Sequence, residues 1–220
     1  MSDFAIYDMD RTITRTGTYT NWLLFWAVRR APWRLLLLPL AGINGLLFVL
    51  KIIDRKRVKE LNQLVLMGRR VSRSQLAPTV EAYADRVMAR NSLPKALAQI
   101  AADKAEGRRV VLATASHRFY VEGIARRLGV TDIVATNSIW HGDRLTWRLD
   151  GENCYGPAKR DMVEAWLEAD GAERGHVRFY SDHATDAPMF DWADEAVAVN
   201  AHPPLQRLAT ERGWRIEDWG

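Results

Sequence analysis

Residues 4–14 read Phe4-Ala5-Ile6-Tyr7-Asp8-Met9-Asp10-Arg11-Thr12-Ile13-Thr14, and they give the strongest indication of the architecture. Its apolar start, Phe4 to Tyr7, has the length and composition of a buried strand. Asp8 and Asp10 follow two positions apart, so both would project to the same side where that strand ends. Two carboxylates this close repel each other unless a cation, a shared proton or a phosphoryl group lies between them. The stretch therefore indicates either a ligand site at the carboxyl end of a strand or a solvated acidic turn.

Length and composition are those of an ordinary folded protein. The chain has 220 residues, of which 48% are hydrophobic and 26% charged. That is enough for one sizeable core, or for a core domain that carries a smaller insertion. Cys154 is the single cysteine, which rules out an intrachain disulfide and fits a reducing compartment. The first residues resemble no signal peptide, so we expect a cytoplasmic location.

The net charge of +4 is unevenly distributed along the chain. Between Arg29 and Arg73 there are eleven basic residues and only two acidic ones, Asp54 and Glu60. The remainder of the chain is therefore mildly acidic. A segment this basic is a candidate to bind an anionic partner, which could be a membrane surface, a nucleic acid or a phosphorylated substrate.

Residues 15–94 are predicted to form an all-helical insertion after the first strand. Their longest uncharged run is sixteen residues, from Leu35 to Leu50. This run is shorter than the roughly 20 residues that a membrane-spanning helix needs. It also contains Pro39 and two glycines, so we expect two helical pieces with a bend. From Asp54 to about Leu97 the apolar residues recur at helical spacing.

The rest of the chain alternates between predicted helices and strands. We expect helices over 93–105, 119–128 and 159–169, strands over 109–113, 133–136, 177–181 and 196–200, and a hairpin within 138–149. Strands that alternate with helices form a parallel sheet with right-handed crossovers. The predicted fold class is therefore α/β, with a Rossmann-like parallel sheet built from residues 1–14 and 95–220 and a cap built from residues 15–94.

Polar side chains follow three of the predicted strands at their carboxyl ends, and a lysine begins one of the helices. These residues are Asp8, Asp10, Thr114, Ser116, Lys159, Asp182 and Asp186. Because the carboxyl ends of parallel strands meet at one edge of a sheet, we expect these side chains to lie close together. Each of them alone has an ordinary structural explanation as a cap or a solvated charge. Their joint occurrence in this order favours a functional site.

In order and spacing, these motifs resemble those of the haloacid dehalogenase-like superfamily, in its phosphoserine phosphatase-like branch. The motifs that carry the resemblance are Asp8-x-Asp10-x-Thr12, Thr114-x-Ser116, Cys154-x-Gly156-x-x-Lys159, Ser181-Asp182-x-x-x-Asp186 and Val199-Asn200. The insertion resembles the helical cap of that superfamily. The resemblance covers almost the whole chain. It implies a Mg²⁺-dependent phosphomonoester hydrolase that works through an aspartyl-phosphate intermediate.

The resemblance also implies a catalytic role for four residues. Asp8 would be the nucleophile, which divides the hydrolysis into two easier displacements. Asp10 would protonate the leaving oxygen and later activate water. Thr114 would donate a hydrogen bond to a phosphoryl oxygen, and Lys159 would neutralise the charge that develops there.

A metal site and a substrate site follow from the same resemblance. Mg²⁺ prefers oxygen ligands and would be held by Asp8, by the backbone carbonyl of Asp10 and by Asp182. Asp186 would hold the metal or its waters. The substrate-binding residues would be Arg11, Thr12, Thr114, Ala115, Ser116 and Lys159.

Two positions depart from the pattern of the superfamily. Arg11 stands where members usually have glycine, so its long side chain either stays clear of the nucleophile or holds a second anionic group. His183 follows Asp182 where a small residue is more usual, and we expect it to be a surface residue rather than a substrate contact.

The cap is expected to select the substrate, and its composition disfavours free phosphoserine. Members that act on phosphoserine hold the amino acid with an acidic and an arginine residue of the cap, but no Asp or Glu lies between Thr14 and Leu50. The cap instead offers Trp22, Trp26, Trp33, the apolar run and many basic residues. This combination is typical of segments at a membrane interface. The alternative is that the apolar run forms the core of the cap.

The favoured substrate is therefore a lipid phosphate such as phosphatidylglycerophosphate, because the chain looks most like the phosphatidylglycerophosphatase C group. The protein would then lie at the inner face of an anionic membrane. One alternative substrate is a small soluble phosphomonoester. A basic binding module or signalling adaptor is less favoured, because it would not need Asp8, Asp10, Lys159 and Asp182. We expect no nucleic-acid partner, because leucine-rich helices bury poorly against a phosphate backbone.

Overall fold

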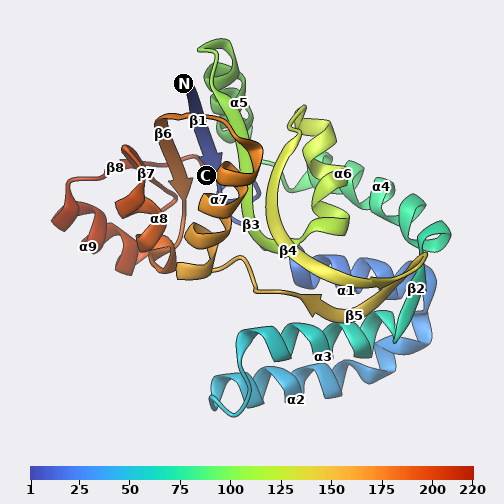
Figure 1. Ribbon diagram of the computed structural model, residues 1–220. Helices are drawn as coiled ribbons and strands as arrows, with labels where there is room; N and C mark the ends of the chain where they lie inside the picture. The colour runs from blue at the N-terminus through green and yellow to red at the C-terminus, as the bar shows by residue number, and fades with distance from the viewer.

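The computed structural model describes residues 1–220 and has an α/β fold with one eight-stranded sheet (Figure 1). The strands are β1 (Ser2–Tyr7), β2 (Arg70–Ser72), β3 (Arg109–His117), β4 (Asp132–His141), β5 (Arg144–Asp150), β6 (Arg174–Ser181), β7 (Glu195–Val199) and β8 (Arg215–Glu217). The α-helices are α1 (Thr18–Arg30), α2 (Leu38–Val49), α3 (Arg55–Met67), α4 (Arg73–Arg90), α5 (Pro94–Ala105), α6 (Arg118–Leu128), α7 (Pro157–Asp170), α8 (Ala187–Trp192) and α9 (Pro203–Arg212). Two 3-10 helices are η1 (Pro32–Leu37) and η2 (Ala184–Asp186).

The strand order in the sheet is β2-β5-β4-β3-β1-β6-β7-β8. Every neighbouring pair in the part of the sheet ordered β4-β3-β1-β6-β7-β8 is parallel. The strand β5 is antiparallel to both of its neighbours, β4 and β2. The predicted parallel sheet and the predicted hairpin, β4 to β5, are confirmed. Since β1 lies between β3 and β6, the three strand ends that carry the polar motifs are adjacent.

Alternating side chains of β1 divide the core between the two faces of the sheet. Ala5 and Tyr7 join a cluster built with α5, α6 and the helices of the cap. Phe4 and Ile6 join a second cluster with α7, α8 and α9. Because successive side chains of a strand point to opposite faces, the apolar run of β1 is buried on both sides.

The cap is helical apart from one short strand. Arg70 to Ser72 form β2, where Val71 pairs with Leu145 of the β5 hairpin. The prediction of an all-helical insertion is therefore wrong at these three residues. The physical reason is local. The helix α3 ends at Met67, before Gly68 with its positive φ of 98°, and Ser72 caps the start of α4. The extended residues between these two helices pair with the edge that β5 leaves open.

The apolar run of the cap forms two helical pieces, as predicted, because Pro39 lies in the first turn of α2, which begins directly after η1. No residue of η1 or α2 is buried, so the run does not form the core of the cap. Trp22 and Trp26 of α1 form that core instead. By length and composition alone, Pro32–Val49 could cross a membrane, with a mean hydropathy of 1.5, a test that core helices of soluble proteins also pass.

A buried carboxylate holds the two central strands in register near the polar motifs. Asp103 of α5 accepts hydrogen bonds from the hydroxyl groups of Tyr7 and Tyr180. It also accepts one from Arg178 Nη1, at 2.6 Å. Tyr7 and Tyr180 stack with their ring centroids 4.3 Å apart. Because Asp8 follows Tyr7 directly and Asp182 comes two residues after Tyr180, this network fixes where both carboxylates leave the sheet.

We expect Asp103→Ala to lower the free energy of unfolding by about 2 to 4 kcal/mol, because two buried tyrosine hydroxyls lose their acceptor. Urea unfolding followed by circular dichroism measures the change. Asp143→Ala serves as the control, since the side chain of Asp143 is 70% exposed. Equal stability of the two variants would show that the Asp103 network does not hold the strands.

Candidate active site

A cavity of about 220 Å³ lies at the carboxyl ends of β1, β3 and β6. Its lining residues are Asp8, Asp10, Arg11, Arg55, Thr114, Ala115, Tyr155, Lys159, Asp182, His183, Thr185 and Asp186. The structure thus brings together most of the residues singled out in the sequence. Thr12 and Ser116 are buried and do not line the cavity. Arg55, Tyr155 and Thr185 line it although the sequence did not single them out.

The floor of the cavity is a buried ion triad. The Lys159 ammonium donates to Asp8 Oδ1 at 2.8 Å and to Asp186 Oδ2 at 2.6 Å. Ser181 at the end of β6 donates to the same Asp186 oxygen at 2.7 Å. The side chain of Lys159 is only 2% exposed. An ammonium so deeply buried needs both carboxylates as partners, so the three charges fix one another.

Burial changes the proton affinities of these groups. It raises the pKa of the Asp8 carboxyl, an effect that the Lys159 ammonium opposes. For Asp182, burial raises the pKa to about 6, again against the attraction of Lys159. Burial alone would lower the pKa of Lys159, but Asp186 and Asp8 outweigh it, so the net pKa is raised and the ammonium stays charged. Around Lys159, the carboxylates of Asp8, Asp182 and Asp186 therefore outnumber the one ammonium.

Asp10 is oriented by hydrogen bonds from two elements. Its Oδ1 accepts from the backbone N–H of Thr18 at 2.9 Å and from the Thr18 hydroxyl at 2.7 Å. Its Oδ2 accepts from the Ser116 hydroxyl at 3.1 Å. The carboxylate therefore lies at the N-terminus of α1, where the helix dipole favours negative charge. Ser116, expected to bind substrate, instead holds Asp10 in place.

The Thr114-Ala115-Ser116 segment at the end of β3 is held by a lysine of the cap. Lys59 of α3 donates to the carbonyl of Ala115 and to Asn153 Oδ1, both at 2.6 Å. Burial lowers the pKa of Lys59 to about 8. Thr114 Oγ1 accepts from the backbone N–H of Ser116 at 3.1 Å, which leaves the hydroxyl proton of Thr114 available to a ligand. Sequence reasoning missed Lys59, although the excess of basic residues in the cap pointed to this segment.

Arg11 adopts the left-handed conformation, with φ of 64°. This explains why the superfamily usually has glycine there, because glycine reaches that region at little cost. Asn200 Nδ2 donates to the Arg11 carbonyl at 3.0 Å and holds the turn. Turned in this way, the Arg11 side chain lies along the cavity wall.

A second arginine reaches the cavity mouth from the cap. The Arg55 guanidinium lies 3.9 Å from the ring centroid of Tyr155 and donates to its hydroxyl at 3.2 Å. Neither Arg55 nor Arg11 forms a salt bridge with a carboxylate. His183, expected on the surface, is half-buried at the same wall and stacks on His202 with centroids 4.5 Å apart. Arg11 and Arg55 thus both line the cavity without a direct ion pair to a carboxylate.

The oxygen atoms of the site fit a hard cation. No three acidic, histidine or cysteine side chains converge closely enough to hold a metal by themselves. Mg²⁺ does not need three, because it binds through one or two carboxylates, several waters and substrate phosphate. Asp8 and Asp182 both line the cavity, and Asp186 Oδ1 is buried without any hydrogen-bond partner.

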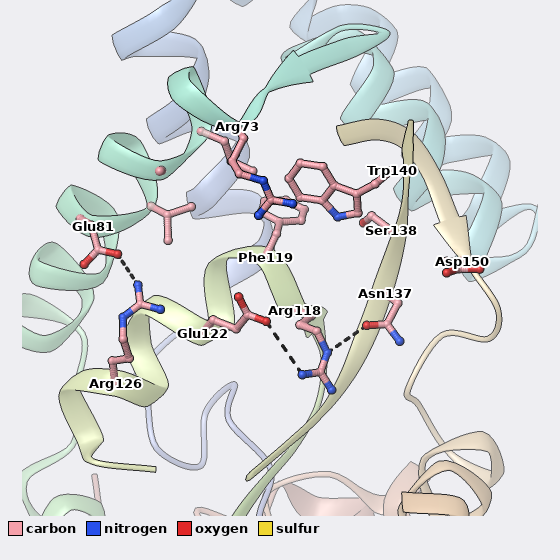
Figure 2. Close-up of a pocket in the computed structure, with 13 residues that line it drawn as sticks. Arg73, Glu81, Arg118, Phe119, Glu122, Arg126, Asn137, Ser138, Trp140 and Asp150 are labelled. Atoms are coloured by element: carbon pink, nitrogen blue, oxygen red, sulfur yellow. Dashed lines mark hydrogen bonds and ion pairs between the residues drawn. The ribbon is translucent and has the colours of Figure 1, made fainter. Parts of the chain in front are cut away.

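A separate cavity of about 450 Å³ lies between α4, α6 and β4 (Figure 2). Its arginines are already engaged, since Arg126 pairs with Glu81 and Arg118 with Asn137 and Glu122. Arg73 packs over the ring of Trp140 at 4.4 Å. This cavity therefore offers no cluster of free charge comparable to that at the strand ends.

The sequence model of the haloacid dehalogenase-like hydrolases matches residues 5–191. The chain belongs to this family. The match includes the cap and all the motif residues from Asp8 to Asp186 that line the cavity. The resemblance stated from the motifs is confirmed.

Curated relatives in this family are similar over about half of the chain. A probable phosphatase of Mycobacterium tuberculosis is 36% identical over 117 residues, which are 53% of this chain and 40% of that protein. Phosphoserine phosphatase SerB1 of the same organism is 36% identical over 113 residues, which are 51% of this chain and 37% of that protein. The aligned region thus spans about two fifths of the length of these relatives.

Solved structures share the fold over the whole chain. A Bordetella pertussis protein described as of unknown function superposes with a TM-score of 0.91 at 24% identity, covering 100% of both chains. A substrate-bound phosphoserine phosphatase complex superposes with a TM-score of 0.65 at 16% identity, covering 100% of this chain and 94% of that one. These structures establish the fold, including the cap.

We expect Asp182→Asn to remove a pH dependence of stability in protein kept metal-free with EDTA. Because folding raises the pKa of Asp182 to about 6, the folded state holds this proton more tightly than the unfolded state does. This stabilisation is fully present below the unfolded pKa near 4. It is lost as the pH rises through the folded pKa of about 6, and the loss is on the order of 3 kcal/mol. Urea unfolding of both proteins between pH 4 and 8 measures it.

The difference in unfolding free energy between Asp182→Asn and the wild type should therefore grow in favour of the variant from pH 4 to 7. Asp161→Asn is the control, because the side chain of Asp161 is 59% exposed and contacts only its neighbour Arg160 and solvent. Parallel pH profiles for wild type and Asp182→Asn would contradict the burial of this charge.

Proposed function

We propose that the chain is a phosphomonoester hydrolase that works through an aspartyl-phosphate on Asp8. The observation that carries the proposal is the buried triad of Asp8, Lys159 and Asp186 at the cavity floor, with Asp10 beside it. Lys159 occupies Oδ1 of Asp8, so the other carboxylate oxygen is free to attack. A structural ion pair alone would not explain why the triad lines an open cavity.

The first displacement transfers the phosphoryl group to the protein. Asp8 Oδ2 attacks phosphorus, the bond from phosphorus to the ester oxygen breaks, and the protonated form of Asp10 gives its proton to the departing oxygen. In the second displacement, Asp10 takes a proton from water. The hydroxide so formed attacks phosphorus, the bond between Asp8 Oδ2 and phosphorus breaks, and inorganic phosphate leaves.

Other residues position the phosphoryl group. The free hydroxyl proton of Thr114 would donate to one phosphoryl oxygen. Lys159 lies where it can share its charge between Asp8 and that group, and Asp186 keeps the ammonium charged and in place. Ser116 and Thr18 act through Asp10, because they set the direction of its carboxylate.

Mg²⁺ would be held by the carboxylates of Asp8 and Asp182 and by the backbone carbonyl of Asp10, with the orphaned Asp186 Oδ1 available to a metal-bound water. When bound, the ion supplies the positive charge that the three carboxylates lack and neutralises the phosphate oxygens. Burial, followed by the negative charge of Asp186, raises the pKa of Asp182 to about 6 in the metal-free site, and a bound cation would oppose both effects.

The substrate that we propose is a lipid phosphate such as phosphatidylglycerophosphate, acted on at an anionic membrane face. Support comes from Arg11 and Arg55, which face the cavity mouth without carboxylate partners and would suit a second anionic group, such as a phosphodiester, next to the reacting phosphate. A cavity of about 220 Å³ holds a phosphate and its near neighbours but no acyl chain. The rest of a lipid would lie outside.

The alternative is a small soluble phosphomonoester in the cytoplasm. Two relatives favour it, phosphoserine phosphatase SerB1 of Mycobacterium tuberculosis and a histidinol-phosphatase of Neisseria meningitidis, which is 27% identical over 114 residues. Neither alternative changes the proposed chemistry at Asp8 and Asp10.

We expect Asp8→Asn to lower the rate of phosphate release by at least about a thousandfold, because the amide cannot form the phosphoenzyme. Asp10→Asn should cost roughly a hundredfold or more, since it can neither give nor take the proton. The rate of phosphate release from p-nitrophenyl phosphate in the presence of excess Mg²⁺ measures both effects. Full activity of Asp8→Asn would overturn the proposal.

Metal use is tested on the same substrate. EDTA should abolish turnover, and Mg²⁺ should restore it. Asp182→Asn should raise the Mg²⁺ concentration needed for half-maximal rate by about tenfold or more, because one of two carboxylate ligands is lost. Unchanged turnover in EDTA would contradict a role for the ion.

The substrate class is tested by comparing phosphatidylglycerophosphate in mixed micelles with phosphoserine. We expect kcat/KM to favour the lipid by at least about a hundredfold, and Arg55→Gln to lower it by roughly tenfold for the lipid but little for p-nitrophenyl phosphate. Equal turnover of both natural esters, still lost in Asp8→Asn, would keep the mechanism and reject the lipid.

A further inference from the structure

The outer side of η1 and α2, with the residues just after them, carries nine exposed large apolar side chains, here called the apolar face. It consists of the exposed residues Trp33, Leu36, Leu38, Leu40, Ile43, Leu46, Val49, Leu50 and Ile52. Leu36 reaches 82% exposure and Val49 73%. Scattered single apolar residues are normal on a protein surface, but a contiguous patch of this kind marks an interaction site.

The inner side of the same segment is fixed to the cap. Asn44 of α2 donates to Asn62 of α3 at 2.9 Å. Arg34 donates to the carbonyls of Leu64 and Val65 at 3.2 and 2.8 Å. Figure 1 shows α2 at the lower edge of the molecule, with α3 between it and β5. The segment is thus laid flat on the protein, and its outer side alone is free for a partner.

The charge around the apolar face selects the partner. No Asp or Glu occurs between Arg11 and Ile53, whereas Arg29, Arg30 and Lys51 flank the segment at its two ends. A second copy of this chain would bring like charges together, which is unfavourable across an interface. An anionic lipid surface offers both hydrocarbon for the leucines and negative charge for the basic residues.

The apolar face also leads to the cavity. Phe48 at the end of α2 lies 5.4 Å from the Arg55 guanidinium, and Arg55 lies 3.9 Å from the ring of Tyr155 at the cavity wall. These three side chains make a short path from the apolar surface to the opening above Asp8. A molecule held with its tails beside α2 would therefore present its polar end near Arg55.

We propose that the apolar face lies in the interface of a bilayer that contains anionic lipid, with α2 parallel to the membrane plane. The apolar side chains enter the boundary between headgroups and acyl chains, and the flanking basic residues contact lipid phosphates. The consequence for substrate access rests on the proposed function, but the binding itself does not. Bound in this way, the protein holds the cavity mouth next to the membrane. The headgroup of a lipid phosphate can then enter the cavity while its acyl chains stay in the bilayer.

The test compares binding of the full chain to sedimented vesicles of phosphatidylcholine with and without phosphatidylglycerol. Wild type should bind vesicles with anionic lipid at least about tenfold more tightly than neutral ones at low salt, and less tightly in high salt. Ile43→Glu combined with Leu46→Glu should weaken binding by at least about tenfold, because two carboxylates would enter the interface. Both side chains are more than half exposed, so folding is unaffected.

The matched control is Ile216→Glu, the same substitution at an exposed isoleucine of β8, outside the cap. It should bind vesicles like wild type. All variants should unfold at similar temperatures and hydrolyse p-nitrophenyl phosphate equally, whereas Asp8→Asn should bind vesicles normally and release no phosphate. The vesicle-binding proposal and the proposed enzymatic function can therefore be rejected separately.

Two results would overturn the proposal. One is wild-type protein that does not bind anionic vesicles at low salt, or binds them as well after the paired glutamate substitutions. The other is a dimer in solution that the paired substitutions, but not Ile216→Glu, convert to monomers, since the apolar face would then be covered by a second copy.

Discussion

The structure depends on one buried cation, the ammonium of Lys159. It lies between Asp8 and Asp186, carboxylates that come from different segments of the chain, and removing it would leave both buried without compensation. The charges at these strand ends can coexist only in that arrangement. This explains why α7 must begin at Pro157, after a positive φ at Gly156, because the lysine then enters the site from the first turn of the helix. The geometry that allows folding is also the geometry that leaves the second oxygen of Asp8 free to react.

The cap is coupled to the core through two cations of one helix. Lys59 of α3 holds the Ala115 carbonyl, and Arg55, one turn earlier, packs on Tyr155 at the cavity wall. Residues four apart lie on the same side of a helix, so α3 presents both to the site. A shift of α3 would therefore move the Thr114-Ala115-Ser116 segment and the cavity mouth together. The position of the cap and the geometry of the cavity are therefore linked through these polar contacts as well as through the apolar cluster that the cap shares with the core.

The sequence predicted the sheet, the hairpin and the motif residues because their signals are local. Alternating apolar runs and the spacing of Asp8 and Asp10 depend on a few neighbouring residues. It did not predict β2, which forms only because β5 leaves an edge open, nor Thr18, Lys59 and Arg55 at the site, whose partners lie far along the chain. Ser116 was placed on the right strand but was expected to bind substrate, because the motif cannot show that its hydroxyl points to Asp10. The last helix, α9, and β8 were not foreseen either.

The apolar run of the cap shows the limit of composition most clearly. A leucine-rich segment has the same composition whether it forms a core or covers a surface. Only its packing in the folded protein distinguishes these two cases. Here Trp22 and Trp26 already fill the core of the cap, so the leucines of η1 and α2 lie outside it. An apolar surface that faces water is unfavourable, and it persists in a folded protein where a partner covers it. The cavity is too small for an acyl chain, and Phe48, next to Val49 of the apolar face, lies beside Arg55 at the cavity wall. One lipid molecule would therefore fill the cavity with its phosphate and cover the apolar face with its acyl chains.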